Sequence, residues 1–161
     1  MNTEVEKEIL EFIEKNKKTY FNFLKSFKGF PYVCDYSSEI LAAFLSSKFN
    51  TELCMIEGNF DSNEDLAHYW IKVNNTIIDF TLLQFLIPEL KCEIAIENNT
   101  IYELVENTIP FPLIKDKNWI DRYDYLDEVS VSQELLDIAD KSDSFVKYLN
   151  NIKPLYKGLI K

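Results

Sequence analysis

Residues 68–81 read HYWIKVNNTIIDFT, which is two apolar runs separated by a pair of asparagines. Asparagine tolerates a positive φ, so Asn74 and Asn75 favour a tight two-residue turn. The runs on either side, Ala67 to Val73 and Thr76 to Phe80, have the length and the β-branched and aromatic content of strands. The sequence therefore predicts an antiparallel β-hairpin whose turn lies at these two asparagines.

The register of this hairpin brings polar side chains together on one face. Counting outward from the turn, Val73 opposes Thr76, Trp70 opposes Asp79 and His68 opposes Thr81; opposed residues, and residues two apart along a strand, share a face. His68 and Asp79 are then diagonal neighbours, about 7 to 8 Å apart between Cα atoms, which a hydrogen bond between their side chains can close.

Asp79 interrupts a run that otherwise has the pattern of a buried strand. A buried carboxylate requires a partner, and His68 is the single histidine of the chain. Thr81 is placed to supply a supporting hydroxyl. A slip of one residue in the hairpin register would turn Asp79 to the opposite face and remove this partnership.

The second chemical signal is Cys34, which follows the loop signal of Gly29, Phe30 and Pro31. A helical apolar stripe begins near Cys34 and ends near Phe49 and Asn50, so we expect the thiol at a helix N-terminus. The helix dipole and a nearby imidazolium both favour the thiolate form of a cysteine. The backbone N–H at the same helix end is a donor for an oxyanion.

These residues suggest a catalytic triad in which Cys34 attacks a carbonyl, His68 transfers the proton and Asp79 orients His68. Trp70 and Tyr32 are the candidate substrate-contacting residues. The candidates for a second oxyanion donor are Asn22, Tyr32 and Gln84. Each residue also has a plain structural interpretation: Cys34 as a small buried apolar side chain, His68 as a hydrogen-bonded core residue and Asp79 as a strand-end cap.

The order of Cys34, His68-Tyr69-Trp70 and Ile78-Asp79-Phe80-Thr81 resembles the papain-like cysteine hydrolase superfamily, and within it the transglutaminase-like group. This resemblance covers residues 29–85 and implies a Cys-His-Asp triad on an α+β core. Arylamine N-acetyltransferases and glutamine-deamidating bacterial effectors share the triad order. The chain departs from the transglutaminase pattern in having Tyr32 and Val33 where a glycine precedes the cysteine, and in a shorter loop between His68 and Asp79.

The rest of the chain also predicts a mixture of helices and strands. We expect a helix from an N-cap at Thr3 to about Lys17, and strands at Thr51 to Glu57 and at Cys92 to Glu97. Asn118 to Asp127 has the composition of a connector, and Val129 to Lys153 is mainly helical. The fold class is α+β in one domain of 161 residues, with a catalytic core at about 20–105 and a helical C-terminal extension at about 115–161.

Composition limits the function classes. The net charge is −10, from 27 acidic and 17 basic residues, which opposes binding to nucleic acid. No apolar run reaches the roughly 18 to 20 residues that span a bilayer. The beginning of the chain does not have the pattern of a signal peptide, so we expect a cytoplasmic protein, or one secreted by a signal-less route if it is an effector. Three cysteines and one histidine predict no metal site and no cofactor.

Two classes of function are therefore expected. The first is a thiol enzyme of acyl transfer on a protein or peptide, as a peptidase, amidase, glutamine deamidase or transglutaminase-like enzyme; the acidic surface favours a basic partner. The alternative is a non-catalytic protein-binding module, of an immunity or effector-associated kind, that keeps the fold. The residues near Cys34 support this alternative, because a glycine is missing there and the oxyanion donors are unassigned.

Overall fold

The computed structural model describes residues 1–161. Its core is a five-stranded antiparallel sheet that includes the hairpin of residues 68–81. The strands lie in the order β4-β3-β2-β1-β5. Their bounds are β1 Met55–Phe60, β2 His68–Val73, β3 Thr76–Ile78, β4 Leu113–Ile114 and β5 Tyr123–Val129.

The hairpin register follows the prediction. Within the ladder of β2 and β3, Val73 pairs with Thr76, and Ile71 pairs with Ile78. Asn74 takes a φ of 52° in the turn, which an asparagine tolerates at low cost. Strand β3 ends at Ile78, so Asp79 is the first residue beyond the ladder, and its N–H bonds the Pro112 carbonyl at 2.9 Å.

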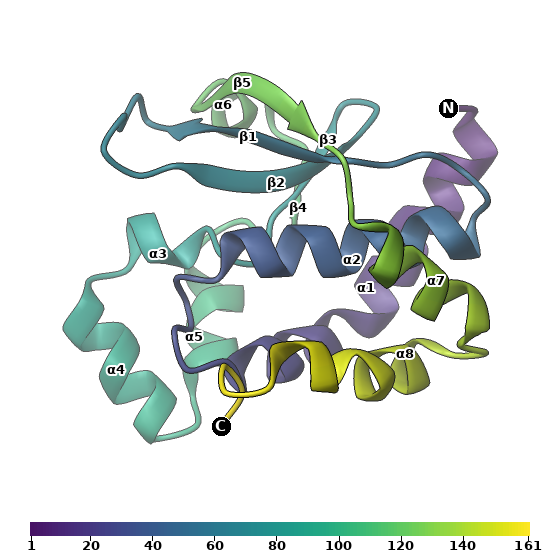
Figure 1. Ribbon diagram of the computed structural model, residues 1–161. Coiled ribbons are helices and arrows are strands. Elements are labelled where there is room, and N and C mark those ends of the chain that lie inside the picture. Colours follow the sequence, from purple (N-terminus) through teal and green to yellow (C-terminus); the bar gives the residue numbers. More distant parts are fainter.

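Helices cover the sheet. Helix α2 runs along one face of the sheet, and α1 and α8 lie on the far side of α2 (Figure 1). The helices are α1 Thr3–Lys25, α2 Cys34–Lys48, α3 Leu83–Leu86, α4 Glu89–Glu97, α5 Ile101–Thr108, α6 Lys117–Ile120, α7 Gln133–Lys141 and α8 Phe145–Ile152, with a 3-10 turn at Lys153–Tyr156. The chain is thus a mixed α+β fold.

Both faces of the sheet are buried against apolar residues. The larger cluster joins α1, α2 and α8 to Ile71, Val73 and Ile78 on the α2 face. A smaller cluster contains Trp70 and Ile77 with side chains from β1, β4 and β5. Because both faces are covered, all three residues of the short strand β3 are buried.

The first helix differs from its prediction at both ends. Asn2 is the N-cap and accepts the Val5 N–H at 2.9 Å, so the cap lies one residue before Thr3. The helix continues to Lys25, well beyond Lys17. Its last turns bury Tyr20, Phe21, Phe23 and Leu24, which extend the apolar face into the aromatic segment.

Two predictions of element type were wrong. Cys92–Glu97 lies in helix α4 and is not a strand, because its buried residues Cys92 and Ala95 are three apart, which is a helical spacing. Asn118 to Asp127 is not only a connector: it contains most of α6 and the greater part of β5, which pairs with β1. The segment 115–161 therefore contributes a strand to the sheet and is not purely helical.

The strand predicted at Thr51 to Glu57 begins later, at Met55, and passes through Gly58 to Phe60. Gly58 has a packing reason to be glycine. A Cβ there would lie 2.0 Å from the Asp124 carbonyl oxygen and 2.4 Å from Cη2 of Trp70. Trp70 thus lies across the backbone of β1, and only glycine leaves room for it.

None of the helices is both long enough and apolar enough to cross a membrane.

Candidate active site

The three residues of the predicted triad come from three separate elements. His68 is the first residue of β2, Asp79 follows β3, and Cys34 is the first residue of α2. The His68 Nε2 atom lies 2.6 Å from Asp79 Oδ2, which is a short charge-assisted hydrogen bond. The hairpin register thus brings the histidine and the aspartate into contact as the sequence predicts.

The Asp79 carboxylate is buried, at 2% exposure, and both of its oxygens are occupied. Oδ1 accepts the Thr81 N–H at 2.9 Å and the Thr81 hydroxyl at 3.3 Å. Oδ2 accepts the Tyr123 hydroxyl at 2.7 Å in addition to the His68 bond. Three residues therefore satisfy the carboxylate, and Thr81 provides the supporting hydroxyl that the sequence suggests.

The charges of the pair reinforce each other. Burial opposes protonation of His68, but the charge and the hydrogen bond of Asp79 outweigh it, and with a contribution from Cys34 they raise the His68 pKa to about 9. Burial also opposes ionisation of Asp79, but the His68 charge and the hydrogen bonds it receives lower the Asp79 pKa. At neutral pH the pair is an imidazolium beside a carboxylate.

Cys34 also acts on the imidazole. It contributes, after Asp79, to the raised pKa of His68. Nε2 is engaged by Asp79, so Nδ1 is the ring nitrogen that remains for another partner. Cys34 is 9% exposed, whereas His68 is fully enclosed. Both residues are buried, and His68 is the more enclosed of the two.

Gln84 is a further neighbour of His68. Its Nε2 lies 3.3 Å from His68 Nδ1 and 3.4 Å from the Thr81 hydroxyl. The Gln84 amide therefore lies beside the ring nitrogen that is not bonded to Asp79. Among the three candidate oxyanion donors, Gln84 is the one that contacts the imidazole; Asn22 lies on the α1 surface with Lys18, Lys25 and Asn99.

Aromatic rings enclose the imidazole. The ring centroid of His68 is 4.8 Å from that of Phe85, 5.7 Å from Trp70 and 6.0 Å from Tyr123. Trp70 is 2% exposed, so it forms an inner wall of the site and offers no surface to a substrate. Tyr32 is 51% exposed and close to the acidic side chains of α4.

The surroundings of the thiol are acidic. The Tyr69 hydroxyl donates to Glu57 Oε2 at 2.8 Å. This hydrogen bond, burial and the charges of Glu57, Asp35 and Cys34 raise the Tyr69 pKa to about 12. Neither Asp35 nor Glu57 forms an ion pair with a basic side chain. The carboxylates around Tyr69 are therefore not neutralised by a lysine or an arginine.

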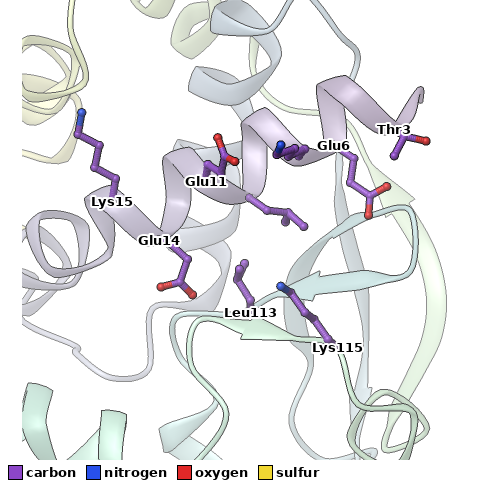
Figure 2. Close-up of a pocket in the computed structure, with 9 residues that line it drawn as sticks. Thr3, Glu6, Glu11, Glu14, Lys15, Leu113 and Lys115 are labelled. Carbon is purple, nitrogen blue, oxygen red and sulfur yellow. The ribbon is translucent and has the colours of Figure 1, made fainter.

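A groove of about 750 Å³ lies away from this site, along α1 and the end of β4 (Figure 2). Its two apolar lining residues are Leu10 and Leu113, and its other lining residues are Thr3, Glu6, Lys7, Glu11, Glu14, Lys15 and Lys115. It contains no cysteine or histidine, so it holds no nucleophile of the kind found at Cys34.

Sequence reasoning missed Tyr123, and it named Gln84 only as one of three candidate oxyanion donors. Tyr123 lies 44 positions after Asp79, in a segment interpreted as a connector. The alternation of Tyr123, Asp124 and Tyr125 was the available signal of a strand, and pairing with β1 would have placed it in the sheet.

No family model, no curated protein and no solved structure matches this chain.

Proposed function

We propose that this protein is a thiol enzyme of acyl transfer, with Cys34 as the nucleophile, His68 as the proton carrier and Asp79 as the group that orients His68. The observation that carries the proposal is the position of His68. One ring nitrogen bonds a buried carboxylate at 2.6 Å, and Cys34, the first residue of α2, contributes to the raised pKa of the same ring. This is the arrangement of a nucleophile, a base and an orienting group.

The proposed reaction begins with the thiolate of Cys34 beside the imidazolium of His68. The sulfur attacks the carbonyl carbon of an amide, forming a C–S bond and an oxyanion that the backbone N–H groups at the start of α2 stabilise. His68 gives its Nδ1 proton to the leaving nitrogen as the C–N bond breaks, which leaves a thioester. His68 then takes a proton from water or an amine as that molecule attacks the thioester, and the thiolate is released.

The same proposal includes a papain-like or transglutaminase-like core. Its support is the chain order of Cys34, His68 and Asp79, with the cysteine opening a helix that packs on an antiparallel sheet. The substrate we propose is a protein or peptide with basic groups near the reacting amide. Asp35, the residue after Cys34, and Glu57, which binds the Tyr69 hydroxyl, favour such a substrate by charge.

Alkylation of the thiols tests the proposal directly. Native protein is treated with iodoacetamide at pH 6 to 7, and the label on each of the three cysteines is quantified by mass spectrometry. We expect Cys34 to be labelled fastest, and the His68→Ala variant to lose that advantage while it keeps its circular dichroism spectrum. Cys54 and Cys92 are internal controls, because burial raises the pKa of each and neither contacts His68. Equal and slow labelling of all three would reject the enzyme.

A second candidate is a non-catalytic protein-binding module that keeps this fold. One observation favours it: His68 is 0% exposed, and the larger hollows lie elsewhere on the molecule. A buried polar cluster of this kind also serves to specify a fold. This candidate predicts that Cys34→Ser leaves partner binding intact, whereas the enzyme predicts that the same change abolishes turnover of an amide substrate.

A further inference from the structure

Tyr123 contacts the candidate site from β5, one of the two edge strands of the sheet. Its hydroxyl donates to Asp79 Oδ2 at 2.7 Å, and the same oxygen lies 2.6 Å from His68 Nε2. The ring packs edge-on against Trp70 at 5.0 Å and against Phe60 at 5.1 Å between centroids. Tyr123 is 9% exposed, so both its ring and its hydroxyl are fixed by their surroundings.

The hydrogen bonds from Thr81 and from Tyr123 fix the Asp79 carboxylate relative to different parts of the fold. Thr81 is two residues away, so its two bonds to Oδ1 fix the carboxylate only relative to its own loop. Tyr123 belongs to β5, which pairs with β1, and β1 in turn pairs with the strand that carries His68. The bond from Tyr123 therefore holds the carboxylate relative to the sheet, and so relative to the imidazole.

We propose that Tyr123 is a positioning residue of this site: its hydroxyl holds Asp79 Oδ2 toward His68 Nε2 and shares the negative charge of that oxygen. The inference rests on the proposed function, since it assigns a residue to the same proton-carrying pair. Because one oxygen accepts two donors, the imidazole receives only part of the charge that an otherwise identical carboxylate would offer. Tyr123 therefore sets how tightly His68 holds its proton as well as where Asp79 points.

The charged and titratable groups around this pair are few. Asp79 bonds His68 from the end of β3, and Cys34 at the start of α2 contributes to the raised pKa of His68. Tyr123 faces Asp79 from β5, and Arg122 and Asp61 act on Tyr123 from the surface side. Arg122 and Asp61 pair with each other through two hydrogen bonds, of 2.7 and 2.6 Å, so their charges largely cancel at the tyrosine.

The single histidine allows a direct test by NMR, since its ring protons need no assignment among several histidines. The His68 pKa is measured in the wild type, in Tyr123→Phe and in Tyr125→Phe. Tyr125 is the matched control, because it lies two residues along the same strand and is 59% exposed. We expect Tyr123→Phe to raise the His68 pKa by about half a unit or more, since the carboxylate loses a charge-assisted donor. Tyr125→Phe should leave the pKa unchanged. An unchanged or lower pKa in Tyr123→Phe overturns the inference.

A measurement on the wild type decides the question if Tyr123→Phe fails to fold. The Tyr123 hydroxyl proton should appear as a slowly exchanging downfield signal with a nuclear Overhauser contact to the His68 ring. Its chemical shift should follow the titration of His68. A hydroxyl proton that is absent, or whose shift ignores that titration, overturns the inference. Neither measurement requires activity, so a failure here is distinct from equal labelling of the three cysteines, which would reject the proposed function alone.

Discussion

The Nε2 atom of His68 lies 2.6 Å from the Oδ2 atom of Asp79. The two residues belong to a hairpin with a two-residue turn, and their side chains are buried. Both partners resist burial as isolated ions, yet each retains its charge because the other is adjacent. The pair therefore links the chemistry of the site to the stability of the fold. Removing either charge should change both.

The raised pKa of His68 predicts that the protein loses stability at high pH. The folded-state pKa is about 9, above the ordinary value of 6.5, so the stabilisation is complete below pH 6.5 and is lost as the pH rises through 9. The shift corresponds to about 3 kcal/mol at most. We expect the free energy of unfolding in urea to fall between pH 6.5 and pH 9.5, and His68→Gln to show a flatter dependence. Parallel curves for the two proteins would contradict this.

The hairpin and its register follow from local rules, which explains why they were predicted from the sequence. Asn74 and Asn75 set the turn, and a two-residue turn leaves one register for Val73, Thr76 and the residues beyond. The start of α2 at Cys34 follows from an apolar stripe of helical spacing. Every part of the prediction that was confirmed depends on residues close together in the sequence.

The parts that were missed depend on contacts between distant segments. Strand β5 reads as a connector because its middle residues are exposed, and only pairing with β1 makes it a strand. The residues of α4 alternate in a way that suggests a strand, and their helical form depends on what Cys92 and Ala95 meet in the core. Tyr123 enters the site through that same distant pairing, so no local pattern assigns it to Asp79.

Asp79→Asn should change both the reactivity of Cys34 and the stability of the fold, and the two effects can be measured separately. We expect the His68 pKa to fall below 6.5 in the folded variant, because burial then acts without a compensating charge. The rate of Cys34 alkylation at pH 7 should fall about tenfold or more, because the thiolate loses the imidazolium that favours it. The stability should fall by about 3 to 5 kcal/mol, as for other broken buried pairs.

The matched control for this variant is Asp124→Asn. Asp124 is exposed and accepts a hydrogen bond from the Ser62 hydroxyl at 3.1 Å, outside the pair. Urea unfolding and alkylation rates are measured for both variants. If Asp124→Asn reduces the Cys34 rate as much as Asp79→Asn does, a general change in surface charge is responsible and not the buried pair.

Gly58→Ala should disturb the candidate site by displacing Trp70, which packs against His68. The added Cβ would lie 2.0 Å from the Asp124 carbonyl and 2.4 Å from the Trp70 ring, so β5 or Trp70 must move. Trp70 packs against both His68 and Tyr123. We expect a loss of about 1 to 3 kcal/mol or more in urea unfolding, together with a slower Cys34 reaction. Gly29→Ala is the control, because its nearest neighbour is 3.7 Å away; a similar loss in both variants would point to glycine flexibility in general.

Gln84→Glu tests which ring nitrogen serves the thiol. The amide of Gln84 lies 3.3 Å from His68 Nδ1, so a carboxylate there would hold the Nδ1 proton in a second ion pair. We expect the His68 pKa to rise above its value of about 9 and the Cys34 alkylation rate at pH 7 to fall at least about tenfold, since the new charge competes with the thiolate for the same proton.

Gln133→Glu is the matched control for this change, because Gln133 is an exposed glutamine of α7 that bonds only Asp137, at 2.9 Å. It adds the same charge to the protein without approaching the imidazole, so it should leave both the His68 pKa and the Cys34 rate unchanged. If Gln84→Glu raises the His68 pKa but leaves the Cys34 rate unchanged, the thiol does not depend on Nδ1. The proton transfer proposed for Cys34 would then have no path, because the other nitrogen is closed by Asp79.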